Sequence, residues 1–191
     1  MRSLGSELRI GLISNPHGSR AELLRWVLHA LEQPADPNES YVDLFSRFQS
    51  VLLSEYAAGR SVVLIFDEAQ NLSAEALEEL RMFININSGK DEVLQLVLIG
   101  QPELRDMLTQ PGLEQLAQRV IARYHLGPLS REESAQYVAH RLAVAGPAGV
   151  AAGATPFDPA ALATLHKLAG GVPRRINLLA DRALLGAYAQ G

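Results

Sequence analysis

The stretch VVLIFDE, residues 62–68, decides the fold that we expect for this chain of 191 residues. Its first five residues, all branched or aromatic, have the composition of a strand buried in a parallel sheet. Asp67 and Glu68 follow this apolar run directly. Ligands of open α/β sheets bind beyond the carboxyl ends of the strands, so we expect both acids at a binding edge.

Paired acids at such an edge suit a nucleoside triphosphatase, in which Asp67 would hold Mg²⁺ and Glu68 would polarise the attacking water. The alternative is that the two acids only cap the helix that follows. The usual companion of such acids is the phosphate-binding loop G-x-x-x-x-G-K-[ST]. That pattern does not occur in the 191 residues, whose only Gly-Lys pair, residues 89–90, is followed by Asp91.

Composition limits the class of protein. The chain is 48% hydrophobic and 20% charged, which is enough apolar material for a core and argues against disorder. A net charge of −4 gives no general attraction for nucleic acid and argues against a nucleic-acid partner. The absence of cysteine excludes disulfides and thiolate metal sites. The apolar runs at 62–66 and 96–99 are too short to span a bilayer, so we expect a cytoplasmic protein, attached to the inner membrane only through other segments or partners.

Strand and helix patterns alternate along the first two thirds of the chain, which predicts a parallel sheet covered by helices. Residue types and periodicity predict strands at 8–14, 62–67 and 94–99, a short strand at 123–126, and a helix over 113–121. Ser19, Ser40 and Ser73 are the predicted N-caps of three further helices, the first with a capping box formed by Glu22. Gly89 is the predicted stop of the third helix.

Only helices are predicted after Pro128. Ser130 with Glu133 forms a second capping box, and residues 146–156 form a linker rich in small residues. The next helix is expected to begin at Asp158-Pro159, and Gly170-Gly171 separates it from the last one, beginning at Pro173. We therefore predict an α/β domain over residues 1–128 and a helical domain over residues 129–191.

Five further residues, in three places along the chain, are candidates for the site. Gln101 follows the third strand, so its amide would face the same edge as the acids, or else bond only to its own turn. Arg119 lies near a helix end and Arg123 lies in the short strand expected after it. From there an arginine can reach across a subunit interface to a phosphate, or simply form surface ion pairs. Arg174 and Arg175 lie in the first turn of a helix, where the helix dipole disfavours cations, so an anionic partner or plain solvation would account for them.

The order of these motifs resembles the AAA+ ATPases of the ExeA/GspA type, which belong to bacterial envelope assembly, including type II secretion. The resemblance covers almost the whole chain and is carried by five segments: VVLIFDEAQN at 62–71, LIGQPEL at 98–104, QRV at 118–120, YHLGPLS at 124–130 and GVPRRIN at 171–177. It implies a P-loop NTPase-like αβα sandwich with a parallel sheet, followed by a small helical lid.

The resemblance also implies roles for individual residues. Asp67 matches the Walker B acid associated with magnesium, and Glu68 matches the catalytic base. Gln101 occupies the sensor-one position that contacts nucleotide. Arg119 becomes the best arginine-finger candidate and Arg123 the second; the lid's sensor-two arginine, a further contact to the nucleotide, is Arg174. The implied cofactors are ATP and Mg²⁺, and the implied partners are further copies of the chain and proteins of envelope secretion or export.

The missing phosphate loop is the main departure from this family. In the family a central strand and the loop precede the segment that here begins near Met1. Without them the backbone donors and the lysine that hold the phosphates are absent, so we expect this chain to bind ATP weakly and to hydrolyse little or none. The missing strand would lie between strands 94–99 and 123–126, and its loss would leave unpaired backbone on both. Either the sequence is a fragment or wrongly started gene product, or the sheet is closed in another way.

Three functions are consistent with these residues. The first is an ATPase module that acts as an oligomer on envelope machinery. The second is an AAA+-derived scaffold that does not hydrolyse ATP. The third is a regulator of DNA transposition, because ATPases of transposition have similar cores, although the acidic balance argues against it.

Overall fold

The computed structural model describes residues 7–87, 92–146 and 155–190. The chain divides into two compact units, residues 1–123 and 124–191. The division lies five residues before the boundary expected from the sequence, and each unit is described by itself.

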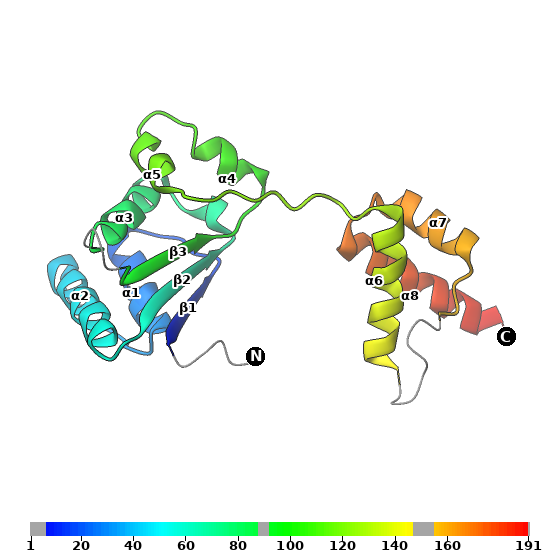
Figure 1. The fold of residues 1–191 in the computed structure, drawn as a ribbon, viewed down its shortest axis with the longest axis horizontal. Helices are drawn as coiled ribbons and strands as arrows, with labels where there is room; N and C mark the ends of the chain where they lie inside the picture. The colour runs from blue at the N-terminus through cyan, green and yellow to red at the C-terminus, as the bar shows by residue number, and fades with distance from the viewer. Residues whose placement is uncertain (1–6, 88–91, 147–154, 191) are drawn as a thin grey trace. The chain divides into compact units, whose positions relative to one another are not determined.

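The first unit is built on a parallel sheet, in which the described residues form three strands, β1 (Leu8–Ser14), β2 (Ser61–Asp67) and β3 (Leu94–Leu98). The strands lie in the order β1-β2-β3 (Figure 1). The register places Ser14 beside Asp67 and Phe66 beside Leu98. All three predicted strands are therefore present. Their carboxyl ends meet at one edge of the sheet, which is where the acids were expected.

The apolar run of β2 has one fully buried face and one half-buried face. Val62, Leu64 and Phe66 are inaccessible to solvent and form the core with the long helices of this unit. These helices are α1 (Arg20–Ala30), α2 (Tyr41–Ala57) and α3 (Ala74–Ile84). On the other face of the sheet, Leu12 of β1 and Val97 of β3 are exposed. The uninterrupted apolar composition of residues 62–66 thus predicted a more deeply buried strand than the described residues provide.

The predicted N-caps of these helices are confirmed. The side chains of Ser19, Ser40 and Ser73 accept backbone hydrogen bonds at the starts of α1, α2 and α3, and Glu22 completes the capping box of α1. Helix α3 ends at Ile84, before Gly89, which lies outside the described residues. A short 3₁₀ helix, η1 (Ala69–Asn71), and two short helices, α4 (Pro102–Met107) and α5 (Glu114–Arg119), complete the unit.

The predicted strand at residues 123–126 is wrong. No strand covers these residues, and the side chains of Ile121, Tyr124 and Leu126 are 97%, 90% and 84% exposed. Within the described sheet β3 pairs only with β2, so the strand expected between β3 and this segment has no counterpart there. A β-prone segment forms a strand only when a neighbour supplies its hydrogen bonds, and here none does.

In the part of the second unit that the structure describes there are three helices, α6 (Arg131–Ala145), α7 (Pro159–Ala169) and α8 (Pro173–Gln190). The predicted capping box of Ser130 and Glu133 and the predicted N-cap Asp158 are both present. Residues 147–154 of the predicted linker lie outside the described residues. The core of this unit is small, with Val138, Leu165, Ala169 and Ile176 at its centre.

Gly170 and Gly171 make the tight turn between α7 and α8. Both have positive φ angles, 63° and 71°. A Cβ on Gly171 would lie 2.2 Å from the carbonyl oxygen of Leu129, and the Leu129 N–H donates to the Gly171 carbonyl. Gly171 therefore holds the entry to α6 against the start of α8, which no other residue could do without displacing backbone. Among the described helices of both units, none is long and apolar enough to cross a membrane.

Candidate functional site

Asp67 and Glu68 lie at the carboxyl end of the central strand. Asp67 is the last residue of β2, and its Oδ1 accepts a hydrogen bond of 3.0 Å from the backbone N–H of Glu68. The backbone N–H of Asn15, just after β1, donates to the Asp67 carbonyl at 3.2 Å. One carboxylate oxygen of Asp67 is thus used to shape the turn, and the other has no hydrogen-bond partner among the residues that the structure describes.

Glu68 has an unusual backbone conformation, with φ 56° and ψ 39°. This left-handed region is uncommon for residues with a Cβ and persists only where the surroundings impose it. The Asn71 N–H donates to the Glu68 carbonyl at 2.9 Å, and the Ala69 N–H donates to the Ile99 carbonyl at 2.8 Å. The turn is therefore fixed both locally and by the segment that follows β3. Such strained residues cluster at functional sites, which marks Glu68 for closer attention.

Gln101 lies beside Glu68, as the parallel sheet predicts. Its side-chain Nε2 is 3.5 Å from Glu68 Oε2 and donates to it. Gln101 is also the N-cap of α4 but makes no side-chain capping bond, so its amide is directed to the site rather than to its own turn. The structure thus brings together three of the predicted site residues, Asp67, Glu68 and Gln101.

Sequence reasoning missed three amide side chains at this edge. Gln70 donates from Nε2 to Glu68 Oε2, and its Oε1 accepts the backbone N–H of Gln101 at 3.1 Å. Asn71 Nδ2 donates to Asn15 Oδ1 at 2.7 Å, which ties η1 to the end of β1. The signal was present in the segment VVLIFDEAQN, where two amides follow the acids within three residues. Their partners lie far away in the sequence, and only the fold identifies them.

Arg119 and Arg123 lie outside this group of contacts. Arg119, the last residue of α5, donates to Asn85 Oδ1 at 3.4 Å, and Arg123 donates to the Ala117 carbonyl at 3.2 Å. Both side chains are exposed, and in the described parts of the chain neither is paired with a carboxylate. Their charges are therefore open to a partner.

Arg174 and Arg175 differ although they are adjacent in the first turn of α8. Arg175 donates to the Leu168 carbonyl at 3.0 Å and so satisfies a carbonyl in the last turn of α7. Arg174 is exposed and makes no hydrogen bond or ion pair with the described residues. Arg175 thus has a local structural role, whereas Arg174 is the one of the two that is available to an anion. Both belong to the second unit, and the acids belong to the first.

Asp67 and Glu68 suit a Mg²⁺ ion that is bound together with substrate phosphates better than a metal ion that only protein side chains ligate. Within the described residues there is no group of three or more His, Cys, Asp or Glu side chains that could hold a metal ion. Mg²⁺ usually keeps several waters and is bound by one or two carboxylates together with substrate phosphates. Asp67, with Glu68 next to it, offers that donor set and would need phosphate oxygens to complete it.

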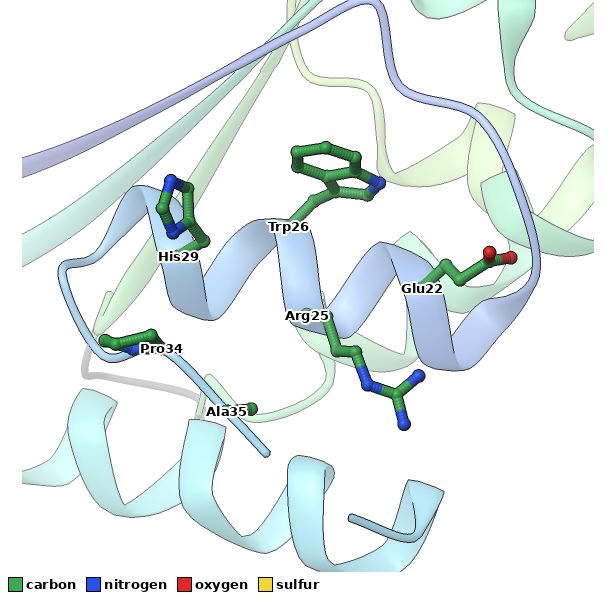
Figure 2. Close-up of a pocket in the computed structure, with 6 residues that line it drawn as sticks. All are labelled: Glu22, Arg25, Trp26, His29, Pro34 and Ala35. Atoms are coloured by element: carbon green, nitrogen blue, oxygen red, sulfur yellow. The ribbon is translucent and has the colours of Figure 1, made fainter. Parts of the chain in front are cut away.

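A separate hollow of about 320 Å³ lies along the outer side of α1 (Figure 2). It is lined by Glu22, Arg25, Trp26 and His29 of α1 together with Pro34 and Ala35. Glu22 belongs to the capping box, and Arg25 donates from Nη2 to the carbonyls of Pro37 and Glu39, while its Nε is buried without a hydrogen-bond partner among the described residues. What remains is mainly the half-exposed ring of Trp26, so this hollow lacks the grouped acids and amides of the strand-end site.

The parallel sheet with acids at the end of its central strand defines an α/β protein of the P-loop NTPase-like class. A family model described as "AAA domain" matches residues 6–108, more than half of the chain. The chain therefore belongs to this AAA family. General secretion pathway protein A of Aeromonas hydrophila is 44% identical over all 191 residues. The chain spans 34% of that relative's length.

Solved structures support the same fold. The ORC2 protein of Aeropyrum pernix, in its ADPNP-ADP complexes, matches with a TM-score of 0.66 and 16% identity, over 98% of this chain and 49% of that one. The ADP form of ORC2 matches with the same TM-score over 96% of this chain and 49% of that one. At this level of identity the likeness concerns the fold alone.

Proposed function

We propose that this chain carries the metal-binding, water-activating and lid parts of an ATPase domain. The observation that supports this best is the grouping of Asp67, Glu68 and Gln101 at the ends of two adjacent parallel strands, with Glu68 held in a left-handed turn. A carboxylate that binds Mg²⁺, a second that accepts a proton from water and an amide that orients the phosphate are three of the parts that phosphoryl transfer to water uses.

Each residue has a defined part in this proposal. Asp67 holds the Mg²⁺ that accompanies ATP, Glu68 accepts the proton of the attacking water, and Gln101 contacts the γ-phosphate. Mg²⁺ supplies charge neutralisation to the phosphates. Arg119, or failing it Arg123, reaches the nucleotide of a neighbouring copy. Arg174 of the helical lid contacts the γ-phosphate of the nucleotide that its own copy binds. The exposed and unneutralised guanidinium groups of Arg119 and Arg174 are consistent with these parts.

The biological role that we propose follows from the relative. Because the chain is 44% identical to general secretion pathway protein A, we propose that its oligomer couples ATP hydrolysis to the assembly of bacterial envelope secretion or export machinery. The place of action would be the cytoplasmic face of the inner membrane, reached through partners or other segments. Both proposals concern the activity of a whole protein. The 191 residues correspond to 34% of the length of the relative.

The 191 residues alone are predicted to hydrolyse little or no ATP. They contain no G-x-x-x-x-G-K-[ST] loop, so the backbone donors and the lysine that hold the β- and γ-phosphates are missing. We expect the phosphate release of the purified chain to equal that of its Glu68→Gln variant and of a buffer blank. Turnover that Glu68→Gln abolishes would contradict this prediction and would show that phosphate is held by other groups.

The second candidate function is a scaffold that does not hydrolyse ATP in the cell. The exposed apolar face of the sheet, with Leu12 and Val97, favours it because such a face suits a protein partner. Calorimetry on the gene product as the cell makes it, with ATP and Mg²⁺, separates the two functions. Saturable binding that Asp67→Ala weakens supports the ATPase, whereas the absence of binding supports the scaffold.

A further inference from the structure

We propose that Gln70 is a positioning residue for the candidate base Glu68. Both polar atoms of its side-chain amide form hydrogen bonds in the structure. One bonds to Glu68 at the end of β2, and the other bonds to Gln101 in the segment after β3. This inference rests on the proposed ATPase function and adds to it a residue for which the sequence alone suggested no role.

The contacts of Gln70 connect Glu68 with Gln101. Nε2 of Gln70 donates to Glu68 Oε2, while Oε1 accepts the backbone N–H of Gln101 at 3.1 Å. Gln101 Nε2 donates to the same oxygen of Glu68 at 3.5 Å. One carboxylate oxygen of Glu68 therefore accepts from two amides, which come from η1 and from the segment after β3.

This arrangement leaves the other oxygen of Glu68 free. Among the described residues, no hydrogen bond or ion pair occupies Glu68 Oε1. A general base needs one lone pair directed at the water and a fixed orientation of the carboxylate plane. Holding Oε2 supplies the orientation, and Oε1 remains available for the proton.

The surroundings of Gln70 allow little freedom to its side chain. Gln70 lies in the single turn of η1, whose start is fixed by the Ala69 N–H bond to the Ile99 carbonyl. A Cβ at Gly100 would lie 2.7 Å from Gln70 Oε1, so the glycine makes the room in which the amide lies. The amide is thus confined between Glu68 and the chain after β3.

Two substitutions distinguish two possible roles of Gln70: positioning of the base Glu68, and a simple cross-link between the two strand ends. In Gln70→Met both bonds are lost at nearly constant size. In Gln70→Glu a carboxylate oxygen can still accept the Gln101 N–H, but no donor faces Glu68 and a like charge lies beside it. If Gln70 acts only as a cross-link, Gln70→Glu resembles wild type. If it positions Glu68, both variants impair hydrolysis.

The experiment measures steady-state ATP hydrolysis by the gene product as the cell makes it. We expect kcat to fall at least about tenfold in both Gln70 variants, because general-base catalysis contributes roughly 10²–10⁴-fold, while KM for ATP changes less than about twofold. Gln33→Met, in an exposed loop, is the matched control. Wild-type kcat in Gln70→Glu would overturn the proposal.

A second measurement keeps the test independent of turnover. In the 191-residue chain, amide hydrogen exchange of Gln101 should accelerate in Gln70→Met and stay near wild type in Gln70→Glu. Unchanged exchange in Gln70→Met would show that the bridge does not form and would refute the inference alone. If hydrogen exchange shows that the Gln70 bridge forms but the wild-type gene product hydrolyses no ATP, the proposed function is refuted, and the role of Gln70 is refuted with it.

Discussion

Glu68 shows how one residue of this chain combines strain with chemistry. Its left-handed backbone turns the chain directly after β2. The turn allows the Glu68 side chain to meet amides from two segments, Gln70 from its own and Gln101 from the next strand end. Replacing Glu68 with another residue that has a Cβ would keep the backbone strain but lose the side-chain hydrogen bonds that compensate for it. Replacing Glu68 with glycine would remove both the strain and the carboxylate.

Gly100 allows a prediction at the residue scale. In Gly100→Ala the new Cβ would lie 2.7 Å from Gln70 Oε1, 3.0 Å from Leu104 Cδ2 and 3.2 Å from Leu104 Cβ, and Leu104 belongs to the buried core. Because both neighbours would have to be displaced, the free energy of unfolding should fall by about 1–3 kcal/mol. The amide of Gln70 would be displaced from its bridge, so kcat should fall as it does in Gln70→Met.

The measurements for Gly100→Ala are a thermal unfolding curve of the 191-residue chain and ATP turnover by the whole gene product. Gly59→Ala is a poor control because Gly59 has a positive φ of 73°. Gly186→Ala suits better, since Gly186 lies in α8 with open space around its Cβ position. Normal turnover in Gly100→Ala would mean that the Gln70 bridge tolerates a methyl group.

At the scale of secondary-structure elements, a cluster of ion pairs connects α2 to the sheet. Glu55, near the end of α2, is 7% exposed and pairs with Arg60, just before β2, and with Arg9 of β1. Arg9 also donates to the Leu31 carbonyl just after α1. The hydrogen bond from Arg60, helped by the charges of Arg60 and Arg9, lowers the pKa of Glu55 below its ordinary value against the effect of burial.

This cluster predicts how stability depends on pH. A carboxyl whose pKa is lower in the folded chain stabilises the fold above its unfolded pKa, and that contribution disappears as the pH falls through the folded value. Stability should therefore decrease below about pH 4, the ordinary range of a glutamate. Glu55→Gln should cost roughly 1–3 kcal/mol at pH 7 and should reduce this acid dependence.

Urea unfolding of the 191-residue chain between pH 3 and pH 7 tests this prediction. Glu75→Gln is the matched control, since Glu75 is an exposed residue in the first turn of α3. An acid dependence equally steep in wild type and in Glu55→Gln would show that other carboxyls are responsible.

Local signals in the sequence predicted most of the elements, and pairing between distant segments explains the errors. Caps such as Ser19 and Ser130 satisfy helix donors within three residues, so a short stretch of sequence reveals them. The segment 123–126 has strand-forming residues but no partner in the described sheet, and composition alone does not reveal a missing partner. The Gln70–Gln101 bond joins residues 31 positions apart, so the site acids were predictable and their bridge was not.

At the scale of the whole molecule, the chain has two separate hydrophobic cores of very different size. The core of the first unit includes the buried faces of the sheet and of three long helices. Among the described residues of the second unit, the buried members of the core are Val138, Leu165, Ala169 and Ile176. The free energy gained from hydrophobic burial scales with the apolar area removed from water. The second unit, with its smaller core, should therefore be much less stable than the first.

Ile176→Ala is therefore predicted to unfold the second unit and leave the first intact. Ile176 is fully buried, and truncation of such a side chain costs roughly 2–5 kcal/mol, which is comparable to the whole stability expected of so small a core. Amide hydrogen exchange followed residue by residue should show lost protection across α6, α7 and α8 while β1, β2 and β3 keep theirs. Leu178→Ala, on the same helix but 51% exposed, should change neither unit. Equal loss of protection in both units would show instead that the chain unfolds as one cooperative body, and the helical unit would then be stabilised by contacts beyond its own core.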